Sequence, residues 1–376
     1  MRFIHCSDLH LGRRLGELDL LEDQGSMLDQ LIGLARQHQA DALLLAGDLY
    51  DRSVPSIGAV RLLDRFFTAC SQAHLPVYAV SGNHDSAERL DYASGFLQEH
   101  GVHLASVFTG DLVRWDLADE HGPLTLWGLP FIKPGAVRFY WPDENIQNYT
   151  DAVACVIRKA DPDFSRRNLL IAHQFVTGGG SQPVAAGSES LNVGTLDNVD
   201  ASVFDGFDYV ALGHIHGAQS AGRDQVRYCG TPLKYSAAEA GQDKSVLLVE
   251  LGEKGRVHWT PLPITPRRDL RRIQGPLAQL EAHASAPDDY IYAVLTDPAP
   301  VADAAARLRA VYPNLVRIEF TYAQARAAAA QSAVPTAPQR KSPLELFDSF
   351  YASVHGQAMS PEEQAVMQQI FEEVCP

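Results

Sequence analysis

The sequence predicts an α/β protein in which a large layered domain precedes a small α+β domain and a helical tail. Three observations lead to this prediction. Short apolar runs, nearly continuous in Val, Ile, Leu and Ala, have the pattern of strands buried on both faces. Longer amphipathic stretches separate these runs, and strands that alternate with helices form layered α/β domains. After residue 265 the pattern changes to that of a smaller unit.

The large domain is expected over residues 1–265. Its main helices are expected at residues 24–39 and 56–73, and Ser56 can cap the second of these because its hydroxyl can accept from a free backbone N–H. Its strands are expected at residues 2–6, 40–48, 75–83, 168–173 and 207–214, with further strands at 124–131, 226–232 and 245–251.

The segment "TPLPITPRRD", rich in proline and arginine, marks the junction to the second domain. Residues 266–322 follow as a predicted β-α-β-α-β unit. Residues 323–342 are rich in Ala, Gln and Pro and are predicted to be a linker. The tail, 343–376, carries apolar residues at helical spacing and a second helix start at Ser360, so we expect a helix pair whose apolar face docks on another surface, either that of a partner or that of the chain's own large domain.

The amino-acid composition limits the class of protein to which this chain can belong. The 376 residues are 46% hydrophobic and 20% charged, as in ordinary globular proteins, and no apolar run approaches the ~20 residues of a membrane span. The five cysteines are scattered without a CxxC pair, which predicts reduced thiols and a cytoplasmic protein. The net charge of −15 disfavours a surface that wraps nucleic acid, but it leaves room for a local basic groove or a basic partner.

Five separate stretches place metal-competent side chains just after a predicted strand. Open α/β sheets form their sites at this edge. In the pairs Asp-x-His and His-x-His, we expect an extended backbone that projects alternate side chains to one side. Gly47, Gly82 and Gly213 let the chain turn sharply beside them. The candidate residues are Asp8, His10, Asp48, Asp51, Asn83, His84, Asp85, His173, His214 and His216.

Seven of these ten residues, namely two Asp, one Asn and four His, are taken as metal ligands. A ligand set of this kind suits Mn²⁺, Fe²⁺ or Zn²⁺ better than Ca²⁺ or Mg²⁺. Seven ligands are too many for one ion and suit two, with one carboxylate bridging. Each stretch by itself is weak evidence, since a lone histidine at a strand end is more often a core residue. The other nine histidines stand alone and are interpreted as ordinary residues.

The stretches "SDLHLG", "GDLYDR", "GNHD", "AHQ" and "GHIH" together resemble the motifs of calcineurin-like metallophosphoesterases. That resemblance implies a four-layer α/β/β/α sandwich. The segments "FVTGGGSQP", "YCGTPLKYSAAEAGQDKSVLLVEL", "LPITPRRDLRRIQGPL" and "PLELFDSFY" further resemble the SbcD family, the nuclease subunits of bacterial SbcCD complexes. The likeness extends over nearly the whole chain.

The resemblance implies a Mn²⁺-dependent nuclease, a 3′→5′ exonuclease on double-stranded DNA ends and an endonuclease on single strands and hairpins, serving DNA end processing, replication and recombination. It implies a coiled-coil SbcC-type ABC ATPase as partner, gripped by the tail, and a capping domain at 266–322. It also implies a homodimer within a heterotetramer, formed through helices after Val54 and Arg89.

The resemblance also implies roles for individual residues. His84 would be no ligand but would stabilise charge at the scissile phosphate or protonate the leaving oxygen. Asp51 and Asp85 would orient His84 or a ligand, or would simply form turns. One ion would be held by Asp8, His10, Asp48 and His216, and the other by Asp48, Asn83, His173 and His214, so that Asp48 bridges.

Other functions share these motifs. A phosphomonoesterase or a cyclic-nucleotide phosphodiesterase would carry the same metal ligands, and a DNA-end scaffold could retain them without turnover. The second domain and the tail favour the nuclease. Basic residues near the motif loops (Arg13, Arg14, Arg52, Lys133 and Arg138) and the aromatic stretch "RFYWP" are candidate DNA contacts or ordinary loop residues.

Overall fold

The computed structural model describes residues 1–178 and 198–321, together with 347–348, 351, 359–360, 363–364 and 366–367. Residues 1–319 form one compact unit and residues 320–376 a second. The predicted linker and most of the predicted tail lie outside the described residues. The three boundaries between the four predicted segments therefore stay predictions.

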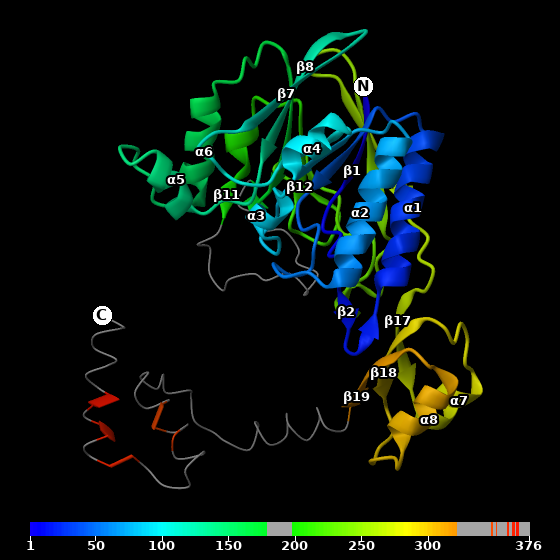
Figure 1. The fold of residues 1–376 in the computed structure, drawn as a ribbon. Coiled ribbons are helices and arrows are strands. Elements are labelled where there is room, and N and C mark those ends of the chain that lie inside the picture. The colour runs from blue at the N-terminus through cyan, green and yellow to red at the C-terminus, as the bar shows by residue number, and fades with distance from the viewer. Residues whose placement is uncertain are drawn as a thin grey trace. The chain divides into compact units, whose positions relative to one another are not determined.

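The first sheet has six strands in the order β16-β15-β1-β4-β5-β6 (Figure 1). Its four consecutive strands from β1 to β6 are parallel, and the two late strands add to one edge in antiparallel fashion. Helices α1 (Leu21–Gln37) and α2 (Ile57–Gln72) lie side by side over this sheet. The strands are β1 (Arg2–Cys6), β4 (Ala42–Ala46), β5 (Val77–Val80), β6 (Val102–Ala105), β15 (Ser245–Leu251) and β16 (Val257–Pro263).

The second sheet has the order β13-β14-β12-β9-β8-β7. Its central strands from β8 to β14 are parallel, and both outermost strands are antiparallel to their neighbours. Helices α5 (Pro134–Tyr140) and α6 (Tyr149–Ala160) belong to this half. The strands are β7 (Val113–Asp119), β8 (Gly122–Leu129), β9 (Arg167–His173), β12 (Tyr209–Gly213), β13 (Gln219–Ala221) and β14 (Arg223–Tyr228).

Three hydrophobic cores define the layers. One contains Phe3, Leu44 and Ile171 from both sheets and lies between them. A second joins the first sheet to α1 and α2 through residues such as Leu31 and Phe66. The third joins the second sheet to α6, with Val156 at its centre. Helix, sheet, sheet and helix are thus stacked in four layers, which confirms the predicted sandwich.

Short elements complete the large half and carry several of the loops at the site. They are β2 (Arg14–Leu15), β3 (Leu18–Asp19), α3 (Ala87–Leu90), α4 (Ser94–Glu99), β10 (Val176–Thr177), β11 (Val199–Asp200) and the 3₁₀ turns η2 (Ala201–Phe204) and η3 (Ala237–Glu239).

Helix starts follow their capping residues. The Ser56 hydroxyl accepts from the Ala59 N–H at 3.2 Å, so the predicted cap of α2 is confirmed. Helix α1 begins at Leu21, earlier than the predicted residue 24, because the Asp19 carboxylate accepts from the Leu21 N–H at 2.7 Å and so satisfies one of the free N–H groups at the helix start.

The small unit follows the predicted β-α-β-α-β order and forms the three-stranded sheet β17-β18-β19. Its contacts to the large half are both apolar and polar. Leu270 and Tyr290 join the hydrophobic core that contains Leu20 and Leu31. In addition, Arg268 pairs with Asp23 at 3.2 Å, Tyr290 donates to Asp23 at 2.8 Å, and Lys234 pairs with Asp269 at 2.8 Å. The elements are β17 (Leu270–Gly275), α7 (Leu277–Ala282), β18 (Tyr290–Leu295), α8 (Ala304–Val311) and β19 (Leu315–Phe320).

In the second unit, Ser360 and Glu363 form a reciprocal cap. The Glu363 N–H donates to the Ser360 hydroxyl at 3.3 Å, and the Ser360 N–H donates to the Glu363 carboxylate at 2.8 Å. The predicted capping role of Ser360 is confirmed. Among the described residues, no helix is both long and apolar enough to cross a membrane.

Candidate metal centre

The five predicted stretches all lie at the carboxyl ends of the central strands. Asp8 and His10 follow β1, and Asp48 follows β4. Asn83 and the two residues after it follow β5, His173 ends β9, and His214 and His216 follow β12. Because the two sheets face each other across a shared core, these ends meet at one place. The candidate residues therefore come together from both halves of the sandwich.

The backbone at the site is left-handed where we expected it to be extended. The φ angles are 53° at Asp8, 43° at His10, 50° at Asp48 and 106° at His214. Such values are uncommon outside glycine and persist only where the surroundings enforce them, typically at functional sites. The predicted extended conformation is therefore wrong at these residues. Leu9 and Ile215, the middle residues of the two pairs, are fully buried in the cores.

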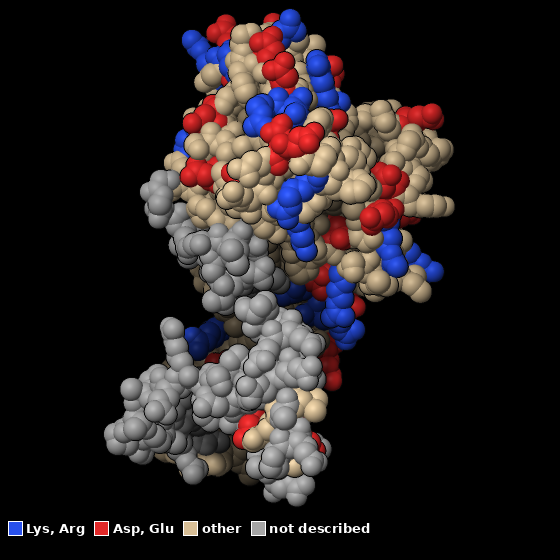
Figure 2. Space-filling view, turned by 90° about the vertical axis from the view of Figure 1, so that its left-hand side faces the viewer, with Lys and Arg blue, Asp and Glu red and all other residues tan. Residues whose placement is uncertain are grey.

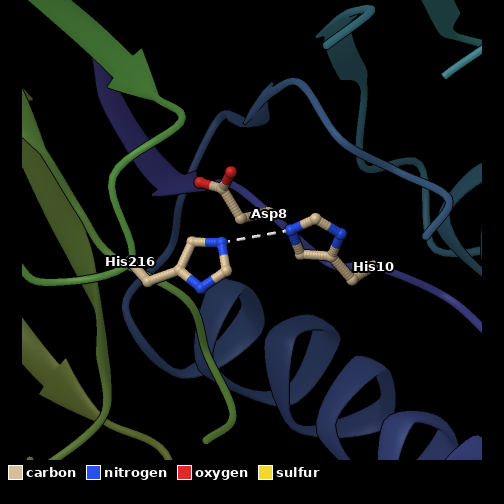
Figure 3. A group of neighbouring side chains, drawn as sticks. All are labelled: Asp8, His10 and His216. Atoms are coloured by element: carbon tan, nitrogen blue, oxygen red, sulfur yellow. Dashed lines mark hydrogen bonds between the residues drawn. The ribbon is translucent and has the colours of Figure 1, made fainter. Parts of the chain in front are cut away.

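The first cluster consists of Asp8, His10 and His216 (Figure 3). The Nε2 atoms of the two histidines lie 3.2 Å apart. Asp8 and His10 come from the loop after β1, whereas His216 comes from the loop after β12. All three side chains are buried, and one ligand atom from each lies within 4.8 Å of the others.

A second cluster surrounds Asn83. Its Oδ1 atom lies 3.0 Å from Nε2 of His173 and 3.0 Å from Nδ1 of His214. The two imidazole rings meet edge to face, with centroids 5.3 Å apart. One amide oxygen and two ring nitrogens thus converge on one point.

Asp48 lies between the two clusters. Its Oδ2 atom is 3.4 Å from Nε2 of His173 and 3.8 Å from Nε2 of His10. Its Oδ1 atom accepts from the main-chain N–H of His84 at 2.8 Å. Burial opposes the charged form, but the histidines around it outweigh burial and lower the pKa of Asp48. The carboxylate is therefore ionised and faces both clusters.

Two glycines are required by this close packing. A Cβ on Gly82 would lie 2.0 Å from Oδ1 of Asp48, and a Cβ on Gly47 would lie 2.3 Å from Nδ1 of His173. Gly47 also has a φ of 87°. Any side chain at either position would displace a candidate ligand.

A main-chain carbonyl orients His173. Its Nδ1 lies 2.8 Å from the Ala46 oxygen, so Nδ1 carries the proton that it donates, and Nε2 faces the cluster. Burial opposes a second proton, but the Asp48 carboxylate outweighs it and raises the pKa of His173 to about 9. In the metal-free protein the ring is thus an imidazolium at neutral pH.

His84 is oriented by a main-chain carbonyl and not by a carboxylate. Its Nδ1 donates to the Asp51 oxygen at 2.9 Å, and its ring meets that of His10 edge to face at 4.8 Å. One atom each from His10, Asp48 and His84 also lie within 4.8 Å of one another. His84 therefore borders the clusters and directs Nε2 away from the Asp51 carbonyl.

The carboxylates of Asp51 and Asp85 have different surroundings. That of Asp85 accepts from the N–H groups of Leu49, Tyr50 and Gly82 at 2.8–3.1 Å, so it ties two loops of the site together. That of Asp51 accepts from Arg13 at 2.8 Å and lies 3.6 Å from Nδ1 of His10. This His10 nitrogen is buried and has no hydrogen-bond partner within the described residues.

One residue at the site was missed in the sequence. Glu239 is fully buried, and its Oε1 atom lies 3.7 Å from Nδ1 of His216. It sits on η3, within the segment "YCGTPLKYSAAEAGQDKSVLLVEL" but at no recognisable spacing from the five stretches that carry the candidate ligands. Only a charged residue within the otherwise small and apolar "YSAAEAG" run hinted at it.

The donor set fits divalent ions. Carboxylate and amide oxygens and imidazole nitrogens converge in a buried place, and among the described candidates none is a sulfur atom. The Nε2 atoms of His10 and His216 face each other at 3.2 Å, which indicates that a cation belongs between them.

The candidate DNA contacts on and next to α5 are exposed. Lys133, Arg138 and the aromatic residues Phe139 and Tyr140 lie on or next to α5, and Phe139 is 79% exposed. Phe131, just before this segment, lies edge to face with His173 at 6.4 Å. The segment therefore begins beside the site.

Comparison with known families places both parts of the chain. Residues 1–218, more than half of the chain, match the family described as calcineurin-like phosphoesterase. Residues 266–355 match the SbcD_C family, described as the type 5 capsule protein repressor C-terminal domain.

Two solved structures that match this chain are remote in sequence. A novel archaeal phosphodiesterase is 11% identical, with 70% of this chain and 100% of that chain covered and a TM-score of 0.31. The protein TT1561 of Thermus thermophilus is 12% identical, with 69% of this chain and 98% of that chain covered and a TM-score of 0.38. Likenesses at this level carry nothing about the reaction.

Proposed function

The chain belongs to the calcineurin-like phosphoesterase family and is a metal-dependent phosphoesterase, and we propose that it is a two-metal, Mn²⁺-dependent DNA nuclease of the SbcD type. The observation that carries the proposal is the SbcD_C match at residues 266–355, which follows a domain with two neighbouring clusters of candidate metal donors. The expected reactions are 3′→5′ exonuclease cleavage of double-stranded ends and endonuclease cleavage of single strands and hairpins.

The two clusters support two ions. Asp8, His10 and His216 would hold the first, and Asn83, His173 and His214 the second. Asp48 would bridge, since its Oδ2 atom faces one histidine of each set at 3.4 and 3.8 Å. Oxygen and nitrogen donors without sulfur support Mn²⁺ as the ion.

Bound divalent ions would lower the pKa of water and neutralise charge that develops on a phosphoryl group. The chain's own residues then have separate tasks. The Asp51 carbonyl fixes the ring of His84, so Nε2 is directed away from it and can protonate the leaving oxygen or stabilise charge on the phosphate. Asp85 keeps the loops of Asp48 and His84 in register.

The surface charge supports a DNA interface that this chain shares with its partner. On the face drawn in Figure 2, basic and acidic side chains are interspersed, in keeping with the net charge of −15. Arg13 and Arg52 next to the site both pair with Asp51. We therefore expect weak DNA binding by the chain alone and a steep rise in affinity with an SbcC-type ATPase, which would supply further phosphate contacts.

The assembly is part of the proposal. Val54, Ile57, Tyr92 and Phe96 are 65–83% exposed, and exposed large apolar side chains support a homodimer. The tail would dock on the ATPase, which would give a cytoplasmic heterotetramer.

One experiment tests the proposal. End-labelled duplex and hairpin DNA are incubated with Mn²⁺ and either the wild-type chain or the variant His84→Ala. Cleavage by the wild type and loss of cleavage in the variant are expected. Fast hydrolysis of p-nitrophenyl phosphate without cleavage of either DNA would instead identify a phosphomonoesterase.

A further inference from the structure

Glu239 is placed against the far side of the His216 ring. Its Oε1 atom lies 3.7 Å from Nδ1, whereas Nε2 of the same ring faces His10 at 3.2 Å. The ring therefore spans from the Glu239 carboxylate to the place proposed for the first ion.

The Glu239 carboxylate is itself held in place by several donors. Oε2 accepts from Lys244 at 2.7 Å and from the Thr231 hydroxyl at 3.1 Å, and Oε1 accepts from the Ser236 hydroxyl at 2.9 Å. Glu239 is 0% exposed and the Lys244 side chain 6%. A buried carboxylate with this many partners has one orientation.

Lys244 also acts on the backbone of His216. Its ammonium donates to the His216 carbonyl oxygen at 3.2 Å, in addition to its contacts with Glu239 and Thr231. The same buried ion pair thus holds both the main chain and the ring of one candidate ligand.

The histidines of the two proposed ion sites differ in what orients them. In the first site, the Glu239 carboxylate lies beside Nδ1 of His216, whereas Nδ1 of His10 has no hydrogen-bond partner within the described residues. In the second, the Ala46 carbonyl orients His173. A carboxylate that accepts the outer N–H of an imidazole makes the ring a stronger ligand than a neutral carbonyl does.

We propose that Glu239 is a positioning residue for the first ion: it fixes the His216 ring with Nε2 toward that ion and strengthens it as a ligand. The inference rests on the proposed two-ion site. It requires that binding of the first ion depends on Glu239 and that binding of the second ion does not. A purely structural Glu239–Lys244 pair would affect stability and both ions alike.

The test measures Mn²⁺ binding by the full chain. Binding is monitored by calorimetric titration and by electron paramagnetic resonance. The variant Glu239→Gln should weaken one of the two binding steps about 10–100-fold, the usual effect of losing such a partner, and leave the other unchanged. At two equivalents of Mn²⁺ the spectrum should change from a spin-coupled pair to isolated ions.

Glu239→Gln leaves the buried Lys244 without a charged partner, so the double variant Glu239→Gln/Lys244→Gln is measured as well. It should show the same selective loss. A matched control is Asp208→Asn, which removes a buried carboxylate that pairs with Lys254 at 2.9 Å and accepts from the N–H groups of Asn168 and Gly255. This control should lower the melting temperature and leave both binding steps intact.

Unchanged binding of both ions by a folded Glu239→Gln or double variant would overturn the inference, as would equal weakening of both steps. Measurements on the wild-type chain distinguish a failure of this inference from a failure of the proposed function. If the wild type binds two ions and cleaves DNA, the proposed function stands whatever Glu239 does; if it binds fewer than two, the two-ion proposal itself fails.

Discussion

Nε2 of His10 lies 3.2 Å from Nε2 of His216, although 206 positions separate the two residues in the chain. Two imidazole nitrogens approach so closely when a proton or a cation lies between them. The contact joins the loop after β1 to the loop after β12, and therefore joins the two sheets of the sandwich.

The two histidines of "GHIH" should serve different ions. His216→Ala is expected to remove the first ion and His214→Ala the second, because the former faces His10 and the latter faces Asn83. Each variant should bind one Mn²⁺ per chain by elemental analysis and keep its circular-dichroism spectrum. Full stoichiometry and full activity in His216→Ala would contradict the assignment.

His84→Ala should lower kcat about 10²–10⁴-fold, the usual contribution of a general acid or base. The ring borders the clusters but donates through Nδ1 to the Asp51 carbonyl, so its loss should leave both ions bound. Cleavage rates and Mn²⁺ stoichiometry are measured on the same preparation. Loss of an ion in this variant would make His84 a ligand.

Asp85→Ala should destabilise the fold by about 1–3 kcal/mol, since the carboxylate accepts from three main-chain N–H groups that would lose their partner. Urea unfolding without metal measures the change. Glu88→Gln, an exposed carboxylate nearby, is the control and should stay within about 0.5 kcal/mol of the wild type. Equal stability of Asp85→Ala and wild type would show that the loops do not depend on this residue.

Metal binding should release a proton from His173. Its pKa is raised to about 9 in the metal-free protein by the Asp48 carboxylate, and an imidazolium cannot bind a cation. Mn²⁺ affinity should rise about tenfold per pH unit up to about pH 9, the linkage for one proton. Calorimetric titrations in buffers of different ionisation enthalpy count the protons that are released when Mn²⁺ binds. If no proton is released at pH 7, the ion pair between His173 and Asp48 is refuted.

The sign of the accompanying stability effect follows from the same shift. Because the folded-state pKa of His173 lies above its ordinary value of 6.5, the pair with Asp48 stabilises the metal-free fold fully below about pH 6.5. That contribution is lost as the pH rises through about 9. Thermal unfolding of the metal-free protein across this range should show the decline.

Ile57→Glu should weaken self-association, since Ile57 is 74% exposed among other large apolar side chains. Light scattering after size exclusion gives the mass. Phe139→Glu changes an equally exposed apolar residue on α5 and should leave the mass unchanged. A monomeric wild-type chain, or a dimer in Ile57→Glu, would exclude this surface as the interface.

The sequence by itself determined the four inner strands of each sheet, because fully buried strands require nearly continuous apolar runs. The outer strands β6, β7, β13 and β16 were not predicted, because they are partly exposed and lack such runs. Their boundaries were accurate where the run was pure, as at residues 2–6 and 245–251. The candidate donors were also accessible from the sequence, since each follows its strand within a few residues and the carboxyl ends of parallel strands meet at one edge.

The tertiary structure alone decided how those donors are held. The left-handed backbone at Asp8 and His10 is a feature that no local sequence pattern specifies. The partners of the ligand rings, the Ala46 carbonyl and the Glu239 carboxylate, reach them from other strands and turns. Such contacts depend on how two sheets pack face to face, and the packing distance and rotation of the sheets are properties of the whole core that short sequence patterns do not record.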